Sequence, residues 1–207
     1  KFCYEQNPNI EFEVGTEEAI RRFEPIQIDI LLTDLGFGLT RKEYNQIKFI
    51  IIQSGTSLKG NTNTGSYDKD RLVSMIKVAK SHNILCKEHN GDYLPPDLIK
   101  EKFKLGLDAI NIAPEFGQIE TKVYLDYIKT SRPDLFGVFY RICYNSDRWR
   151  KWVNKDFNPT TQKEELINIC GHYMLSNFNF EASIKSQFNG IDREIKNKII
   201  AKLNTLL

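Results

Sequence analysis

The sequence predicts an α/β protein with a parallel sheet, followed by a helical region. Four apolar stretches have the length of β-strands, at residues 10–15, 47–55, 84–89 and 108–113. Each is followed by a polar or glycine-rich loop and then by a helical pattern. Beyond residue 118 only helical patterns follow. Repeated strand–loop–helix segments form βα units, whose strands pair in parallel.

The first unit combines a clear strand with an ambiguous helix. Residues 10–15, IEFEVG, alternate between apolar and acidic side chains and end in glycine, which is the pattern of a strand. Thr16, followed by two acids, predicts the start of a helix. The apolar segment 25–39 fits more than one state, and we favour a helix that ends near Gly36 or Gly38.

The second unit carries stronger local signals. Thr40 and Glu43 have the spacing of a capping box, which predicts a short helix. Residues 47–55, IKFIIIQSG, are a nearly continuous β-branched run, as in a strand buried on both faces. Residues 57–67 predict a polar loop of the kind that carries function. Asp68 is placed to cap the helix that follows.

The last two strands flank a helix that begins at Pro95 and Pro96, where proline is tolerated. The strands are residues 84–89, ILCKEH, and 108–113, DAINIA. The remaining chain predicts helices at residues 118–130, 135–144, 147–153, 162–175, 180–188 and 193–207.

Four strands are half of the eight that a closed barrel needs. The chain begins with Lys1 rather than methionine, which we interpret as a sign of a longer polypeptide. We therefore predict the C-terminal half of a TIM (β/α)8 barrel over residues 1–131 and a helical extension over residues 132–207. A small open sheet is the alternative.

Composition excludes several classes of protein. The chain has 207 residues, 41% of them hydrophobic, and a net charge of +2 with scattered basic residues. This does not suggest a nucleic-acid-binding protein. No apolar run is long enough for a transmembrane helix. The four cysteines, which form no C-x-x-C pattern, suit a reducing compartment, and we expect a cytoplasmic protein.

Polar residues at the ends of the predicted strands suggest a site. His89 follows the third strand, and we expect either a metal ligand or acid–base group, or a structural histidine. Asp92 is a candidate catalytic carboxylate or the cap of the Pro95 helix. Glu115 is a site carboxylate or a first-turn acid. Glu13 or Glu11 points into the barrel lumen, or lies on a wet edge strand.

Other notable side chains have structural interpretations. Glu88 should face the opposite side of its strand from its neighbour in sequence, His89. His82 ends a helix and complements the helix dipole. His172 lies among apolar residues and is expected in a core or an interface. Trp149 and Trp152 are expected to pack rather than to stack on a ligand.

The order of FEVGTEE, IIIQSG, KEHNGDY and INIAPEFG resembles the last four strands of the class II, zinc-dependent ketose-bisphosphate aldolases. It is more similar still to the tagatose-bisphosphate aldolase non-catalytic subunit family. The matching positions are Gly15-Thr16-Glu17, Gln53-Ser54-Gly55, residues 88–93 and Ala113-Pro114. The resemblance covers most of the chain.

This resemblance implies a carbohydrate-metabolism lyase that cleaves or forms a carbon–carbon bond in a sugar phosphate, with a divalent metal, zinc, as cofactor. It places His89 in a metal-ligand position and leaves Glu13, Asp92 and Glu115 as acid–base candidates. A second family histidine is absent, since the loop reads Leu58-Lys59-Gly60. The implied substrate-binding residues are Gly55, Lys59, Asn90, Gly91, Asn111 and Gly117.

Two departures affect phosphate binding. Asp92 stands where the family has serine, and together with Glu115 it would repel a phosphate. The phosphate would then lie on backbone N–H groups near Gly91 and Gly117, with Lys59 neutralising charge, or the substrate would end in a polyol.

Two other functions fit the same residues. One is a non-catalytic subunit that stabilises an aldolase partner, which the missing histidine favours. The other is a metal-dependent sugar epimerase or isomerase. We expect a carbohydrate or sugar phosphate as ligand, no nucleic acid or membrane partner, and either a homo-oligomer or a complex with the other barrel half or with an aldolase subunit.

Overall fold

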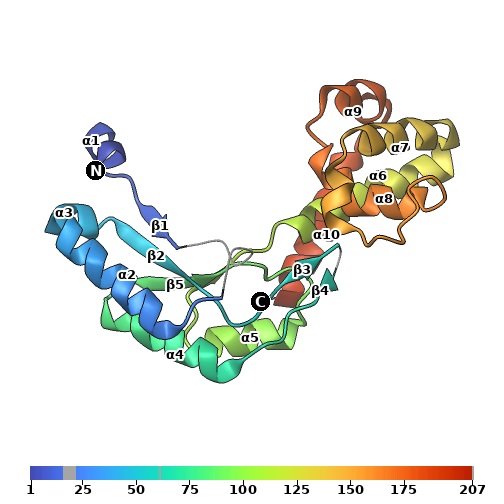
Figure 1. Cartoon of the computed structure of the whole chain (residues 1–207). Coiled ribbons are helices and arrows are strands. Elements are labelled where there is room, and N and C mark those ends of the chain that lie inside the picture. Colours follow the sequence, from blue (N-terminus) through green and yellow to red (C-terminus); the bar gives the residue numbers. More distant parts are fainter. Residues whose placement is uncertain (16–21, 61, 207) are drawn as a thin grey trace. The chain divides into compact units, whose positions relative to one another are not determined.

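The computed structural model describes residues 1–15, 22–60 and 62–206 (Figure 1). It forms two compact units, which we describe separately. The sheet unit comprises residues 1–57 and 63–111, and the helical unit comprises residues 58–62 and 112–207. Thr16, the predicted helix start, and Glu17 of the quoted motif lie outside the described residues.

The sheet unit is built on four parallel strands. In spatial order these are β1 (Phe12–Val14), β2 (Ile47–Ile52), β5 (Leu85–Glu88) and β6 (Ala109–Ile110). Spatial order follows chain order, and each neighbouring pair is parallel. The α/β class and the parallel sheet predicted from the sequence are therefore confirmed.

Helices follow these strands along the chain. They are α2 (Pro25–Gly38), α3 (Arg41–Tyr44), α4 (Lys69–Ser81) and α5 (Pro96–Lys104), and α1 (Phe2–Gln6) precedes the sheet. Figure 1 shows α2, α4 and α5 on the same side of the sheet. A buried apolar core joins the sheet to α2 and α4, and it includes Ile50, Ile52, Leu72, Met75 and Cys86.

Local capping signals explain where these helices begin. The Thr40–Glu43 capping box forms in both directions at α3. The Asp68 carboxylate accepts the Arg71 backbone N–H at 2.9 Å at the start of α4. The ambiguous segment 25–39 is a helix that ends at Gly38, as favoured from the sequence.

The predicted loop over residues 57–67 differs from expectation because it contains a short two-stranded sheet. Its strands are β3 (Leu58–Lys59) and β4 (Thr62–Asn63). Gly60, between them, has a positive φ of 58°, a conformation that suits glycine in a tight turn. Two-residue strands are too short to leave an alternating pattern in the sequence.

The helical unit contains the predicted helical tail. Its α-helices are α6 (Pro114–Ser131), α7 (Phe136–Asn145), α8 (Lys163–Cys170), α9 (Phe178–Ser183) and α10 (Ile191–Leu206). Four 3₁₀ helices lie among the described residues here, η1 (Pro133–Leu135), η2 (Arg148–Trp152), η3 (Gly171–Tyr173) and η4 (Lys185–Gln187).

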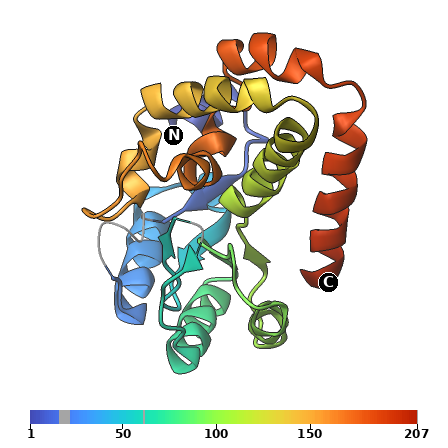
Figure 2. The ribbon, with the colours of Figure 1, turned by 90° about the vertical axis from the view of Figure 1, so that its right-hand side faces the viewer.

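These helices share one buried core. It includes Tyr124 of α6, Phe139 of α7 and Phe180 of α9. The rings of Tyr124 and Phe180 meet edge to face, with centroids 5.0 Å apart. Helix α10 packs along α6 (Figure 2). Within the described chain, no helix combines the length and apolar character that crossing a bilayer requires.

Candidate functional site

Three charged or polar side chains meet on the sheet of the sheet unit. Glu13 of β1 binds two side chains from β5 and its end. Its Oε1 lies 3.1 Å from His89 Nε2, and its Oε2 accepts a hydrogen bond from the Lys87 ammonium group. All three side chains are partly exposed. We call these residues the Glu13 cluster.

Strand geometry explains why they meet. Lys87 and His89 are two residues apart, so their side chains leave β5 on the same face, while Glu88 between them points the other way. Glu13 lies opposite Phe49 of β2, and Lys87 reaches over the same strand, with Nζ 5.8 Å from the Phe49 ring centre. The expectation that Glu88 faces away from His89 is met, since Glu88 is buried and His89 is not.

The environment of Glu13 favours its charged form. Partial burial raises the pKa of this carboxyl group, but the hydrogen bonds and positive charge of Lys87 and His89 outweigh it and lower the pKa below its usual value. Glu13 is therefore a carboxylate at neutral pH. It orients His89 and keeps the Lys87 ammonium group at the site.

Lys87 is the member of the cluster that the sequence analysis missed. It interrupts an otherwise apolar strand two residues before His89. A lysine in a parallel strand that is expected to be buried was the available signal.

The ends of β5 and β6 are joined beside His89. The Gly91 N–H donates to the Asn111 carbonyl at 2.9 Å, and the Asn111 N–H donates to the Glu88 carbonyl at 2.9 Å. A Cβ atom on Gly91 would lie only 2.5 Å from Ile110 Cγ1. Glycine is therefore required by the close approach of the two strand ends, which brings Gly91 and Asn111 together.

Two side chains from the connection between β2 and α4 hold the loop that follows β5 and carries His89. The Thr56 hydroxyl donates to the His89 carbonyl at 3.1 Å. The Asn63 amide donates to the carbonyls of Asn90 and Asp92 at 2.8 and 3.1 Å. Asn90 adopts a left-handed conformation, with φ of 60°. The loop that carries His89 is thus fixed on both sides.

A fully buried ionic network lies on the opposite face of β5. The Lys102 Nζ atom of α5 is 2.5 Å from Glu88 Oε2 and 2.6 Å from Ser54 Oγ. Glu88 Oε1 accepts the Ser54 backbone N–H at 2.7 Å and also its hydroxyl. The Tyr67 ring centre lies 4.7 Å from the Lys102 ammonium group. This network ties the ends of β2 and β5 to α5.

Asp92 and Gly55 are two further predicted site residues of the sheet unit. Asp92 is 2% exposed, and the N-cap residue of α5 is Pro95, so the capping interpretation of Asp92 is wrong. Gly55 has φ of 96°, and a Cβ atom there would lie 2.1 Å from the Ser66 carbonyl oxygen. Only glycine fits this turn.

Three predicted site residues, Lys59, Glu115 and Gly117, belong to the helical unit, whereas the Glu13 cluster belongs to the sheet unit. Glu115 is in the first turn of α6 and pairs with Lys202 at 2.5 Å. A Cβ atom on Gly117 would lie 2.7 Å from His172 Cβ, so glycine allows close packing there. Lys59 is exposed on β3.

The other singled-out residues lie where local structure explains them. His82 is the C-cap residue of α4, and its Nε2 is 2.7 Å from Asp29 Oδ1. Trp149 is buried, and its indole N–H donates to the Tyr144 carbonyl at 3.1 Å. Neither ring nitrogen of His172 has a hydrogen-bond partner among the described residues.

The donor atoms of the Glu13 cluster partly suit a metal ion. A carboxylate oxygen and an imidazole nitrogen are both normal zinc ligands, but a catalytic zinc has three protein ligands. Across residues 1–15, 22–60 and 62–206, no group of three His, Cys, Asp or Glu side chains is placed to hold a metal ion. The cluster supplies fewer ligands than such a site needs.

Comparisons with known proteins support the fold. The chain is similar to a probable tagatose 6 phosphate kinase from Sinorhizobium meliloti 1021, with a TM-score of 0.62 and 15% identity over 84% of this chain and 48% of that one. It is also similar to the fructuronate-tagaturonate epimerase UxaE from Cohnella laeviribosi. In a glycerol complex the TM-score is 0.62 at 13% identity, and in the native crystal structure 0.59 at 11%, each over 99% of this chain and 48% of that chain.

No family model matches this sequence, and neither does any curated protein. The resemblance to class II aldolases is therefore not confirmed as family membership. Identities this low establish a shared fold alone. The chain spans about half the length of the solved structures that it matches, and it shares with them an α/β architecture that occurs in proteins named for sugar chemistry.

Proposed function

We propose that this chain forms part of a carbohydrate-metabolism enzyme that transfers protons at a carbon atom beside a sugar carbonyl group. The carrying observation is the Glu13 cluster, in which a carboxylate contacts both an ammonium group and an imidazole. The cluster lies toward the C-terminal ends of parallel strands, where α/β barrels carry their active sites. We infer that the sheet unit is half of such a barrel.

Each member of the cluster has a role in this chemistry. His89 exchanges the proton, because an imidazole ring can both accept and donate one. Glu13 stays charged and orients the His89 ring. Lys87 places positive charge where the enediolate oxygen would develop, which stabilises that anion. Asn90 and Asn111, at adjacent strand ends, would bind sugar hydroxyl groups.

Epimerisation or isomerisation is the reaction we favour. Both need one proton removed and returned beside a carbonyl, and the cluster contains the groups for this. A structurally similar protein is named a fructuronate-tagaturonate epimerase. Its two named sugars differ at a carbon that is not beside the carbonyl group, so the name supports sugar epimerisation in general and not this particular proton transfer. Aldol cleavage remains the second candidate, because it passes through the same type of enediolate and differs in breaking a carbon–carbon bond.

A divalent metal, with zinc the expected ion, forms part of this proposal. His89 would ligate it, oriented by Glu13, and in that metal-bound form proton transfer would fall to a carboxylate instead of His89. When bound, the metal would polarise the sugar carbonyl group. A titration of the purified protein with zinc, followed by calorimetry, tests this, and Glu13→Gln and His89→Asn should each weaken binding.

Incubation with keto sugars and their phosphates in D₂O tests the reaction. Deuterium uptake at the carbon beside the carbonyl, with a new epimer and intact carbon chain, is expected by NMR. His89→Asn and Lys87→Met should each lower the exchange rate at least about a hundredfold. Glu11→Gln, an exposed change near the start of the same strand, is the matched control and should retain full activity. An unchanged rate of deuterium exchange in His89→Asn would contradict the proposal.

A partner subunit is the second candidate function, and exposed apolar residues on α2 favour it. Ile26, Ile30 and Phe37 are 61%, 53% and 87% exposed. Exposed apolar patches commonly mark protein interfaces. The partner would be another copy, a further part of the barrel or an aldolase subunit. Light scattering should find an oligomer that Ile30→Asp with Phe37→Asp dissociates, and a monodisperse monomer would contradict this.

A further inference from the structure

The helical unit contains a hollow that is separate from the residues of the proposed reaction. Its volume is about 340 Å³, within the range of about 300–1,000 Å³ that is usual for small-molecule sites. One side is the turn of Lys59, Gly60 and Thr62, and the other side comes from residues 152–169. A Cβ atom on Gly60 would lie 3.8 Å from the Trp152 carbonyl oxygen, so turn and helix end are in contact.

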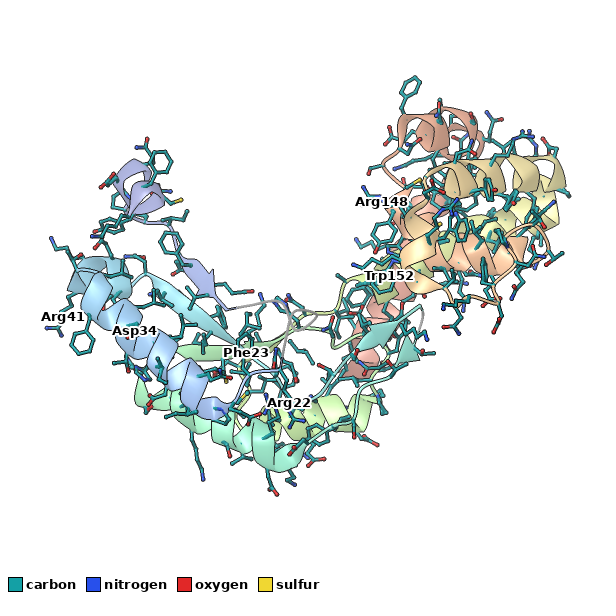
Figure 3. The ribbon with its side chains drawn as sticks, viewed as in Figure 1. Arg22, Phe23, Asp34, Arg41, Arg148 and Trp152 are labelled. Carbon is teal, nitrogen blue, oxygen red and sulfur yellow. The ribbon has the colours of Figure 1, made fainter. Side chains whose placement is uncertain are left out.

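Two aromatic rings give this hollow an apolar wall. Trp152, labelled in Figure 3, ends the 3₁₀ helix η2, and Phe157 follows in the next loop. The Phe157 ring packs against buried Trp149, with ring centres 5.8 Å apart. Both Trp152 and Phe157 are partly exposed, although they pack against the core. Packing therefore holds the rings while part of each remains open to a ligand.

Hydrogen bonds within the protein hold the polar side of the hollow in place before any ligand binds. The Gln162 amide oxygen accepts the Asn158 N–H at 2.7 Å, and its amide nitrogen donates to Glu165 Oε2 at 2.8 Å. The Gln162 backbone N–H donates to the Asn158 backbone carbonyl at 2.9 Å. The loop that closes the hollow is thus held by its own contacts, which lowers the entropy cost of binding.

Charge in the lining identifies the class of ligand. The charged residues are Lys59, Asp156 and Glu165, which together carry one net negative charge. Two carboxylates against one ammonium group make this lining less favourable to an anion than to a neutral molecule, although the Lys151 ammonium group also lies 4.7 Å from the Trp152 ring centre. In the part of the chain that the structure describes, neither the Asp156 carboxylate nor the Lys59 ammonium group makes a hydrogen bond or ion pair. Both remain available to a ligand.

We propose that this hollow binds a neutral sugar. The C–H face of the sugar ring would lie on Trp152 and Phe157, and its hydroxyl groups would donate to Asp156 and accept from Lys59. This combination of an aromatic surface with carboxylate and ammonium groups suits a molecule that is apolar on its face and polar at its rim. Trp149 and Trp152 both pack as expected, and the proposal adds a ligand contact at Trp152.

Fluorescence titration with D-fructose and with D-fructose 6-phosphate tests this site. Both tryptophans lie in the helical unit, so the signal reports on it. A saturable change is expected with fructose, and weaker binding with the phosphate. Trp149→Phe should retain the change, and Trp152→Phe should lose it. Ligand-observed NMR should show fructose binding at least about tenfold weaker in Trp152→Ala.

Asp156→Asn removes the charge with little change in shape. It should weaken fructose binding several-fold and reduce the discrimination against fructose 6-phosphate, while Asp126→Asn, an exposed change on α6, should do neither. Glu13→Gln should leave this binding intact, so loss of the proposed reaction and loss of this site are distinguishable. Absence of saturable fructose binding, wild-type affinity in Trp152→Ala, or tighter binding of the phosphate would each overturn the proposal.

Discussion

Lys102 Nζ lies 2.5 Å from Glu88 Oε2, and both side chains are completely buried. Ser54 completes the network by bonding to both groups. A buried ion pair costs desolvation, and its direct contribution to stability is small. Its consequence is geometric, because Glu88 precedes His89 and Ser54 follows β2 by two residues. The network fixes both strand ends through α5.

Removal of one partner of this pair should be strongly destabilising. Lys102→Met leaves the Glu88 carboxylate buried without its cation, so the free energy of unfolding should fall by about 3–5 kcal/mol. Urea denaturation followed by circular dichroism measures this. Lys104→Met, an exposed change on the same helix, is the control and should stay within about 0.5 kcal/mol of the wild type.

A double substitution distinguishes destabilisation by an unpaired buried charge from destabilisation by lost packing. Lys102→Met with Glu88→Gln removes both charges and keeps an amide oxygen to accept the Ser54 N–H. It should be more stable than Lys102→Met alone, because no uncompensated charge remains. If the double variant is the less stable one, the destabilisation comes from packing and hydrogen bonding instead.

The parallel sheet could be predicted because its strands carry strong local patterns. The β-branched run of β2 and the capping residues Thr40 and Asp68 each specify their element within a few residues of sequence. The hairpin of β3 and β4 could not be predicted from the sequence, since strands of two residues leave no periodic pattern. Nor could the Lys102–Glu88 pair, whose partners come from different elements and look like ordinary surface charges in the sequence.

The candidate site was only partly predictable for the same reason. His89 and Glu13 were recognisable from their positions at strand ends and on an alternating strand. Their contact depends on the register of β1, β2 and β5, which sequence patterns alone do not determine. Gly55 and Gly91 were assigned to substrate binding, whereas the structure gives each a steric reason to be glycine.

The low pKa of Glu13 should depend on Lys87. In Lys87→Met the carboxyl group loses a hydrogen bond and a neighbouring charge, so its pKa should rise toward the ordinary value of about 4.3. NMR titration of the side-chain carboxyl carbon measures it. Lys48→Met, which removes a lysine that pairs with Glu11, should leave the Glu13 pKa unchanged.

The interaction between Lys87 and Glu13 should stabilise the fold more at neutral pH than at acidic pH. A carboxyl group with a lowered pKa in the folded state stabilises the fold above its unfolded pKa, and this contribution is lost as the pH falls through the folded value. The stability difference between wild type and Lys87→Met should therefore shrink on acidification. A difference that grows on acidification would contradict the assignment.

His172 should destabilise the helical unit at acidic pH. Burial lowers the pKa of His172 to about 4, compared with about 6.5 in an unfolded chain. The unfolded state therefore binds the proton first, and stability present above pH 6.5 is lost as the pH falls toward 4. The full loss is about 3 kcal/mol.

Tryptophan fluorescence during urea unfolding at several pH values measures this loss in the helical unit. His172→Leu should remove most of the pH dependence between these two values. His82→Gln, a histidine substitution in the sheet unit, should retain it. Equal pH dependence in His172→Leu and the wild type would show that other groups cause it.

Substitution of Gly91 tests whether this glycine is needed for steric reasons or for ligand binding. Gly91→Ala would place Cβ 2.5 Å from Ile110 Cγ1 and 3.0 Å from the Asn111 carbonyl oxygen. We expect the free energy of unfolding to fall by about 1–3 kcal/mol, as measured by urea denaturation. Gly137→Ala is the control, because open space surrounds that position in helix α7. It should raise stability by up to about 1 kcal/mol.

Ile110→Ala should rescue Gly91→Ala if sterics are the cause. The smaller side chain opens the space into which the new methyl group points, so the double variant should lose less stability than the two single changes added together. A binding role predicts the opposite pattern, in which Gly91→Ala unfolds like the wild type but no longer binds sugar at the Glu13 cluster. The thermodynamic cycle over these two positions therefore determines whether the join between β5 and β6 or a ligand requires glycine here.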